Sequence, residues 1–296
     1  MKHIAKFMAV ALLILATTSC KKEQQAPEEN TTATDTVAKV EKRRIISLNG
    51  ALTEIISALG HQDQIVAVDV TSTYPEGIKD SAKDLGHVRS ISIEALMAEK
   101  PELILATSED LSPELTEKIK LAKVDVRVFD RDYTAEGTKM LIGQVATVLQ
   151  SEGAQKLQDK IDADLKGVEQ LKIQPKVLFI YARGAGTLMV GGKNTPVDKV
   201  IELAGGKNAV TDFEDYKPLT PEALIQANPD VILMFDSGIQ SLGGEQGVLK
   251  IQGIEKTNAG KNKKIIAMDG ALLSGFGPRL GEAAATLNGK FKENAK

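Results

Sequence analysis

Only two of the three histidines are candidate ligands, because His3 belongs to a predicted leader segment. His61 follows a predicted helix end, whereas His87 lies in a polar loop, two residues before Arg89. An imidazole is a good metal ligand, and a guanidinium forms bidentate, charge-assisted bonds to carboxylates. A loop histidine by itself is more often an ordinary surface residue. His87 and Arg89 are therefore candidates for ligand binding that depend on support from the rest of the chain.

Other candidates stand near further predicted strand ends. Tyr74 lies in the loop before the one that holds His87, where its phenol could bind or flank a metal, or simply pack against Pro75. A methionine commonly packs in a core, and an arginine commonly lies on the surface, so structural explanations stay open for the rest. Four further side chains complete the set, namely Tyr181, Arg183, Met189 and Arg279.

Strands that alternate with helices must position these side chains. Short β-branched runs are followed by apolar residues at helical spacing, as in Leu52, Ile55, Ile56 and Leu59. This alternation predicts α/β units with mostly parallel sheets, whose carboxyl ends carry the ligand loops. Residues 137–172 carry helical spacing without a strand signal, which predicts two helices or one long interrupted helix. The predicted strands are residues 45–48, 65–68, 103–105, 126–129 and 177–180.

Part of the first half of the chain recurs in the second half at a constant offset of 128 residues. Glu94 and Glu222 hold the same place in the two copies, in the first turn of a predicted helix. A carboxylate there is favoured by the helix dipole, or serves a partner. The repeat predicts two similar lobes joined by the helical segment. The aligned segments are Ser92–Met97 with Thr220–Ile225 and Pro101–Leu105 with Pro229–Leu233.

The N-terminus has the pattern of an export signal. A basic start, Met1–Lys6, precedes ten apolar residues, Phe7–Ala16, which are too few to cross a bilayer. Cys20 follows directly and is the only cysteine of the chain, so it is either a stray thiol or the lipidated cysteine of a lipoprotein. We predict a signal peptide over residues 1–19, and a lipidated Cys20 that begins a polar, flexible tether over residues 20–42.

Composition and motifs exclude several classes of protein. Hydrophobic residues make up 42% and charged residues 26% of the 296 residues, as in ordinary globular proteins. The net charge of −3, or −5 once Lys2 and Lys6 leave with the signal, gives no electrostatic footprint for nucleic acid. The sequence has neither a Gly-x-Ser-x-Gly elbow nor a phosphate-binding loop, so we expect no enzyme. One well-placed histidine is too few for a zinc or manganese carrier.

Taken together, these motifs resemble the substrate-binding proteins of ABC importers, in the class with a rigid helical hinge that carries haem, cobalamin and ferric siderophores. The resemblance extends from Arg44 to Lys290. It implies the class III periplasmic-binding-protein fold: two Rossmann-like lobes with mostly parallel sheets, joined by a long bridging helix. The expected boundaries are residues 43–135 for the N-terminal lobe, 136–173 for the helical segment and 174–296 for the C-terminal lobe. Haem-binding members have stretches similar to Asp84–Arg89, Arg183–Gly192 and Gly275–Arg279.

Within this class, the resemblance implies a carrier of haem without a catalytic cofactor. His87 would be the axial ligand of the iron, where relatives often carry a tyrosine. Glu94 and Glu222 would dock onto arginines of an inner-membrane permease that works with an ATPase. We expect a monomer, held by its lipid on the periplasmic side of a bacterial membrane, with the inner membrane favoured. The remaining expected cleft residues are Tyr74, Arg89, Tyr181, Arg183, Met189 and Arg279.

The main alternative is a ferric-siderophore or cobalamin carrier on the same fold. Clefts for these ligands tend to be rich in large aromatic side chains, including tryptophan. This chain has no tryptophan and only 11 phenylalanines and tyrosines together. The composition therefore favours haem but leaves the alternative open.

Overall fold

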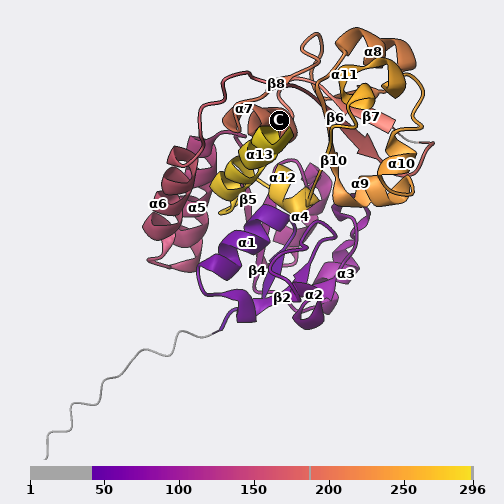
Figure 1. The fold of residues 1–296 in the computed structure, drawn as a ribbon. Coiled ribbons are helices and arrows are strands. Elements are labelled where there is room, and N and C mark those ends of the chain that lie inside the picture. The colour runs from indigo at the N-terminus through magenta and orange to yellow at the C-terminus, as the bar shows by residue number, and fades with distance from the viewer. Residues whose placement is uncertain (1–41, 187, 295–296) are drawn as a thin grey trace, which may run out of the picture. The chain divides into compact units, whose positions relative to one another are not determined.

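A parallel, five-stranded sheet forms the centre of the first lobe in the computed structural model, which describes residues 42–186 and 188–294 (Figure 1). The strand order is β3-β2-β1-β4-β5, and all neighbouring strands are parallel. Strand β4 lies between β1 and β5 and is buried at all five positions, as expected for a strand covered on both faces. The strands are β1 Ile45–Ser47, β2 Ile65–Val68, β3 Lys83–Asp84, β4 Leu103–Thr107 and β5 Asp125–Phe129.

Side-chain caps fix where the helices of this lobe begin. The Asn49 side chain accepts a hydrogen bond from the backbone N–H of Ala51, and the Ser92 and Ser112 hydroxyls accept from N–H groups three residues further on. Gly50 starts its helix where a Cβ would lie 2.6 Å from the carbonyl oxygen of Thr71, so only glycine fits. The helices are α1 Gly50–Ala58, α2 Ile78–Ser81, α3 Ile93–Ala98 and α4 Pro113–Leu121.

Two helices follow the first sheet, as the helical spacing of residues 137–172 predicted. They are α5 Ala135–Leu149 and α6 Ala154–Lys166, and they lie side by side (Figure 1). The body of α5 packs in the core of the first lobe, whereas Ala135 at its start, with Tyr133 just before it, packs against the core of the second lobe. Helix α5 therefore contributes to both lobes, as expected of a bridging helix.

A mixed sheet forms the centre of the second lobe, with the order β11-β10-β6-β7-β9 and β8 pairing with β6. Strands β11, β10, β6 and β8 run parallel, but β7 is antiparallel to both β6 and β9. The sequence predicted the parallel part and missed this antiparallel addition, because β9 is short and exposed along its length. The strands are β6 Lys176–Ala182, β7 Leu188–Gly191, β8 Lys207–Asn208, β9 Tyr216–Pro218, β10 Val231–Phe235 and β11 Ile265–Met268.

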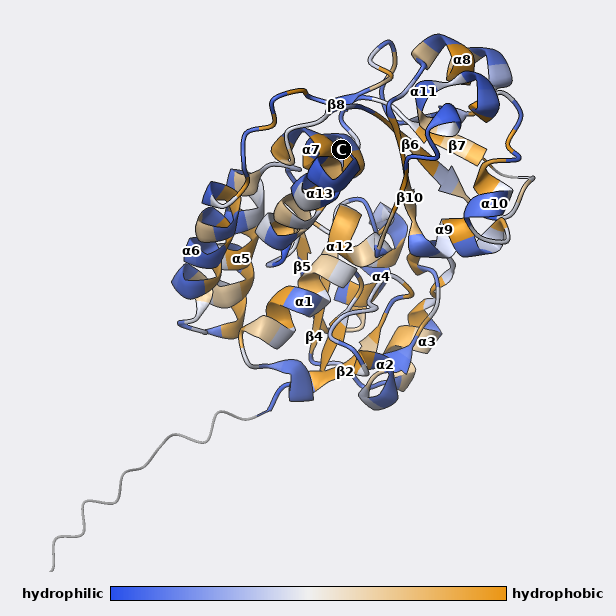
Figure 2. Ribbon diagram, in the orientation of Figure 1, coloured by the Kyte–Doolittle hydropathy of each residue, from blue (hydrophilic) through white to orange (hydrophobic). Residues whose placement is uncertain are grey.

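Helices cover both faces of the second sheet, and apolar residues concentrate on its strands (Figure 2). The last helix packs against α6 on one side and against α7 and α12 on the other, so the C-terminal part of the chain returns to the helical segment. The helices are α7 Pro196–Leu203, α8 Pro221–Ala227, α9 Asp236–Ser241, α10 Glu245–Val248, α11 Asn258–Lys261, α12 Gly270–Ser274 and α13 Leu280–Asn294.

The sequence repeat corresponds to a structural repeat. Ser92 and Thr220 both cap a helix, each accepting a hydrogen bond from an alanine N–H three residues further on. The following strands β4 and β10 each have five residues and start 128 residues apart. Within the described residues, no helix is both long and apolar enough to cross a membrane. The predicted signal peptide and Cys20 lie outside the described residues.

Candidate functional site

The carboxyl edge of the first sheet carries a buried network of hydroxyl groups around a carboxylate. Asp69, which is 1% exposed, follows β2. One of its oxygens accepts a hydrogen bond from the Ser72 hydroxyl at 2.9 Å, and the other accepts from the Thr71 hydroxyl at 2.6 Å. The Ser72 and Thr53 hydroxyls lie 2.7 Å apart, and the Thr53 hydroxyl donates to Ser47 at 2.8 Å. This chain of bonds ties the loop after β2 to β1 and α1.

A second carboxylate lies at the end of β4. Asp110 accepts a hydrogen bond from the Thr107 hydroxyl at 2.5 Å and another from the Asn49 side-chain amide at 3.0 Å. Burial raises the pKa of Asp110, and the nearby charge of Asp69 adds to the rise, while the hydrogen bonds oppose it. Asp110 therefore ties the loop after β4 to Asn49, the residue that caps α1. Neither carboxylate was predicted from the sequence, although Asp69 directly follows a predicted strand.

His87 and Arg89 lie beside these carboxylates. Both side chains are exposed at a pocket of about 290 Å³. His87 caps the short turn Val88–Ser90, since its Nδ1 accepts the backbone N–H of Arg89 at 3.3 Å. The other ring nitrogen has no hydrogen bond within the described residues. The pocket is lined by Asp69, Val70, Thr71, His87, Val88, Arg89, Glu109 and Asp110.

The structure brings Tyr74 and Arg279 together, which the sequence did not predict. The Arg279 guanidinium carbon lies 3.6 Å from the centre of the Tyr74 ring. Arg279 also forms a bidentate ion pair with Glu54 of α1, from Nε to Oε2 at 3.0 Å and from Nη2 to Oε1 at 2.5 Å. Burial raises the pKa of Glu54, and Arg279 acts against that rise. Arg279 was expected to pair with a ligand carboxylate, but its partner here is a carboxylate of the protein itself.

Arg131 and Tyr133, which follow β5, add contacts between the lobes. These contacts were not predicted from the sequence either. Arg131 donates a hydrogen bond to the backbone oxygen of Gly275 and stacks on the Tyr133 ring, with 4.8 Å from its guanidinium carbon to the ring centre. Tyr133 meets Phe276 edge to face at 5.3 Å and donates its hydroxyl proton to Glu109 at 2.6 Å. Burial raises the pKa of Tyr133 above its usual value of 10. Their position at the carboxyl end of β5 was the available signal.

In the second lobe, aromatic side chains gather at the corresponding edge. Tyr181, near the end of β6, contacts Phe235 at the end of β10 edge to face at 6.1 Å. Phe235 also meets Phe179 at 4.9 Å. Met189 of β7 is the direct cross-strand partner of Tyr181, and Arg183 lies 5.7 Å from the Tyr181 ring centre. The structure therefore brings Tyr181, Arg183 and Met189 together.

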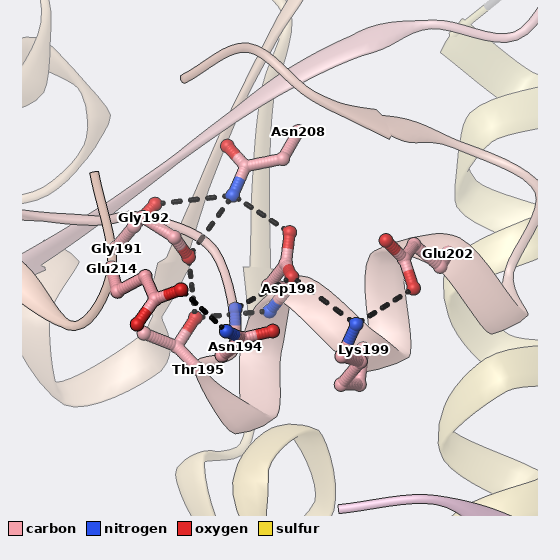
Figure 3. A network of polar contacts seen from close by, with 9 residues as sticks. All are labelled: Gly191, Gly192, Asn194, Thr195, Asp198, Lys199, Glu202, Asn208 and Glu214. Atoms are coloured by element: carbon pink, nitrogen blue, oxygen red, sulfur yellow. Dashed lines mark hydrogen bonds and ion pairs between the residues drawn. The ribbon is translucent and has the colours of Figure 1, made fainter. Parts of the chain in front are cut away.

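A polar network surrounds the last residue of β7, Gly191, and the turn that follows it (Figure 3). The buried Asp198 of α7 accepts a hydrogen bond from the Asn208 side chain at 2.9 Å and from the backbone N–H of Asn194 at 3.0 Å. Asn208 also donates to the backbone oxygens of Gly191 and Gly192, both at 3.2 Å. Since every member bonds to backbone or to another member, the network serves to hold the turn after β7 in place.

The candidate arginines differ in whether they are already paired. Arg279 is paired with Glu54, whereas Arg89 and Arg183 are exposed and form no ion pair within residues 42–186 and 188–294. Glu94 and Glu222 are exposed in the first turns of α3 and α8. Hydrogen bonds to its own backbone and to Ser92 lower the pKa of Glu94, so it is ionised at neutral pH. The described residues contain no cluster of three or more metal-ligating side chains.

Comparison with known proteins gives consistent results. The profile of a family described as periplasmic binding protein matches residues 45–272. The structure is similar to that of the periplasmic heme-binding protein RhuT from Roseiflexus sp. RS-1 in its apo form, with 36% identity and a TM-score of 0.82. The similarity covers 86% of this chain and all of that one.

Two further proteins are similar to this chain in sequence. An uncharacterized ABC transporter substrate-binding lipoprotein, YvrC of Bacillus subtilis, is 28% identical over 86% of this chain and 81% of its own. The vitamin B12-binding protein of Yersinia pestis is 30% identical over 67% of this chain and 70% of its own.

Proposed function

Since the chain belongs to the periplasmic binding protein family, whose members are the solute-binding components of ABC importers, we propose that this protein captures haem between its lobes and delivers it to a permease. One observation carries the proposal. An exposed histidine and an unpaired arginine share a pocket at the carboxyl edge of the first sheet, in a chain 36% identical to a heme-binding protein along that protein's whole length.

His87 is the proposed axial ligand of the haem iron. In the ligand-free structure its Nδ1 accepts a hydrogen bond, so the proton of the neutral ring is on Nε2. Binding of iron through Nε2 of a neutral ring therefore requires this proton to move to Nδ1, which can then no longer accept the hydrogen bond from the Arg89 N–H. We expect the turn Val88–Ser90 to rearrange when haem binds.

Arg89 and Arg183 are the proposed partners of the two haem propionates. A guanidinium binds a carboxylate through two parallel hydrogen bonds, and these two arginines are not neutralised by an acidic side chain of the described residues. They come from different lobes, so a ligand that contacts both would lie between the lobes. Arg279 is a weaker candidate for this role than the sequence suggested, because Glu54 already balances its charge.

The porphyrin itself needs apolar contact area more than hydrogen bonds. Tyr181, Phe235 and Met189 supply such area on the second lobe, where they lie next to one another. Tyr74 supplies an aromatic ring on the first lobe, and its side chain is 42% exposed. Burial of a flat aromatic ligand against such surfaces contributes about 25 cal/mol per Å² of apolar surface removed from water.

Docking onto the permease is proposed for Glu94 and Glu222. They hold equivalent places in the structural repeat, and both point into solvent from the first turn of a capped helix. Two equivalent carboxylates, one on each lobe, suit a permease built from two equivalent subunits. Lipid attachment at Cys20 and a location on the periplasmic side of the inner membrane complete the proposal, with the protein acting as a monomer.

A titration of the purified chain, residues 21–296, tests the proposed ligand directly. Haemin should bind saturably and shift the Soret band. Protoporphyrin IX without iron should bind roughly a hundredfold more weakly, because it lacks the metal–ligand bond. Cyanocobalamin is the comparison ligand that the 30% identical vitamin B12-binding relative calls for. Saturable binding of cyanocobalamin without binding of haemin would overturn the proposal and favour a corrinoid carrier.

A further inference from the structure

The segment Gly275–Arg279, here called the strap, links the second lobe to the first at three points. Its first residue accepts a hydrogen bond from Arg131, and Phe276 contacts Tyr133. Its last residue, Arg279, forms the ion pair with Glu54. Phe276 is 2% exposed and belongs to the core of the second lobe. The strap is therefore anchored in one lobe while its ends bind the other.

Arg279 is held rigidly within this arrangement. Glu54 is 6% exposed and the Arg279 side chain 16% exposed, so water screens their ion pair little. The paired nitrogen and oxygen atoms form a planar fork, which fixes the orientation of the guanidinium as well as its position. A Cβ on Gly277 would lie 3.3 Å from the Glu54 carboxylate, so the strap also packs closely on α1.

The free face of this fixed guanidinium covers the Tyr74 ring. The loop that carries Tyr74 is tied to the first lobe near its start, where Asp69 binds Thr71 and Ser72. No hydrogen bond within the described residues reaches the Tyr74 hydroxyl, so the stack on Arg279 is the directional contact that the side chain makes. A ring with one face covered and 42% of its surface exposed can present the other face to a flat ligand.

We propose that Arg279 is a positioning residue for Tyr74, and that Glu54 holds Arg279 in place for this purpose. A ligand-contacting side chain of the first lobe is then oriented by the second lobe, through the strap. Arg279 acts on the ligand through Tyr74 and does not bind the ligand carboxylates itself. The inference rests on the proposed function only in that Tyr74 faces the bound ligand.

Because the chain contains no tryptophan, a Tyr74→Trp variant carries a single fluorescent reporter at this position. Acrylamide quenching of its fluorescence is compared with and without the double substitution Glu54→Gln and Arg279→Met. Removing both charges together avoids leaving a buried carboxylate unpaired, and replacing a whole buried ion pair is often neutral for stability. The matched control, Glu169→Gln with Lys292→Met, removes an exposed ion pair of α13.

We expect acrylamide to quench the reporter about twofold more strongly after the double substitution, since one face of the indole loses its cover. With Arg279→Lys in place of the double substitution, the reporter should keep only part of its protection from acrylamide, because an ammonium lacks the planar face. The control pair should change nothing. An unchanged quenching constant in a folded double variant would overturn the proposal, and this readout needs no haem, so it is independent of the ligand's identity.

Haemin affinity gives the second readout. When the natural Tyr74 is present, the double substitution should weaken haemin binding roughly two- to tenfold, in line with the range of cation–π interactions. In a Tyr74→Ala background the same double substitution should have no further effect, because the side chain to be positioned is gone. If the affinity losses caused by Tyr74→Ala and by the double substitution are additive, the positioning role is overturned, and Arg279 has a direct or purely structural role instead.

Discussion

Thr107 ends β4 in the first lobe, and Phe235 ends β10 at the equivalent position of the repeat, 128 residues later. Thr107 donates its hydroxyl proton to Asp110 and belongs to the carboxylate and hydroxyl network under His87. Phe235 instead joins Phe179 and Tyr181 in an aromatic group. The same βα unit thus places polar groups at the carboxyl end of the strand in one lobe and apolar rings at that end in the other.

The difference shows how a repeated framework can supply two kinds of contact to one ligand. The parts shared by the lobes are the capped helix, the five-residue strand and the exposed first-turn glutamate. The parts that differ lie at the carboxyl ends of the strands, where side chains affect the fold least and the ligand most. Three experiments test what the lobes share and where they differ.

The largest effect is expected where the lobes are alike. Reversing both charges, Glu94→Arg with Glu222→Arg, should abolish haem uptake by cells, since two ion pairs with the permease become two repulsions. Each single reversal should cost a similar share, because the positions are equivalent. Haemin binding by the purified variant should be unchanged.

The control is Glu117→Arg, a reversal on exposed α4 of the same lobe as Glu94. It should leave uptake unchanged. Normal uptake by the double variant would contradict the docking role of both residues, and a loss confined to one single variant would mean that the permease contacts the lobes unequally.

The next effect tests which lobe supplies the iron ligand. His87→Ala should weaken haemin binding roughly a hundredfold and change the visible spectrum, because the metal–ligand bond is lost. Tyr181→Phe keeps the ring and its contact area, so affinity should change by no more than about threefold. Visible titrations of both variants measure this. The reverse order, with the larger loss in Tyr181→Phe, would move the iron ligand to the second lobe.

The smallest effect concerns the polar network of the first lobe. The pKa of Asp110 is raised from its usual 3.8, chiefly by burial, so its contribution to stability is present below that value and lost as the pH rises above it. Asp110→Asn does not titrate. Between pH 4 and pH 7 its free energy of unfolding should therefore rise relative to wild type, by about 1 kcal/mol or less. Urea unfolding at several pH values measures the difference.

For Asp84→Asn, the free energy of unfolding relative to wild type should change with pH in the opposite direction. The hydrogen bond and charge of Lys79 lower the pKa of Asp84, so wild type gains stability as the pH rises through that lowered pKa toward 3.8. This variant should therefore lose stability relative to wild type as the pH rises through that acidic range, up to about pH 4. Parallel behaviour of the two variants would contradict the burial-based explanation for Asp110.

Periodicity predicted the architecture because buried strands and amphipathic helices leave regular patterns. The strands around Ile45, Ile65 and Ile104, the Ser92 cap and the pair α5 and α6 all follow such patterns. The repeat predicted the equivalence of α3 and α8. The antiparallel strand β9 left no pattern, because its residues are all exposed and its pairing with β7 depends on the turn held by Asp198.

For the site, the sequence shows only which types of residue are present and where the strands end, and only those parts of the site could be predicted. His87 and Arg89, which follow one another closely in a loop, line one pocket, and Tyr181 and Met189 are cross-strand partners. The pairing of Arg279 with Glu54, 225 residues apart, could not be read from one sequence. Such a contact depends on how the lobes pack, and local spacing carries no information about it.

Helix α5, whose body packs in one core while its start packs against the other, has a consequence for the lifetime of the loaded protein. A wide rotation of one lobe would pull Tyr133 or Ala135 out of apolar contacts, so spontaneous opening has to climb a barrier set by side-chain packing. We expect dissociation of the ligand in free solution to be slow. Rapid release would then require a partner that binds both lobes at once and supplies the energy to separate them, so that the cargo leaves mainly at its destination.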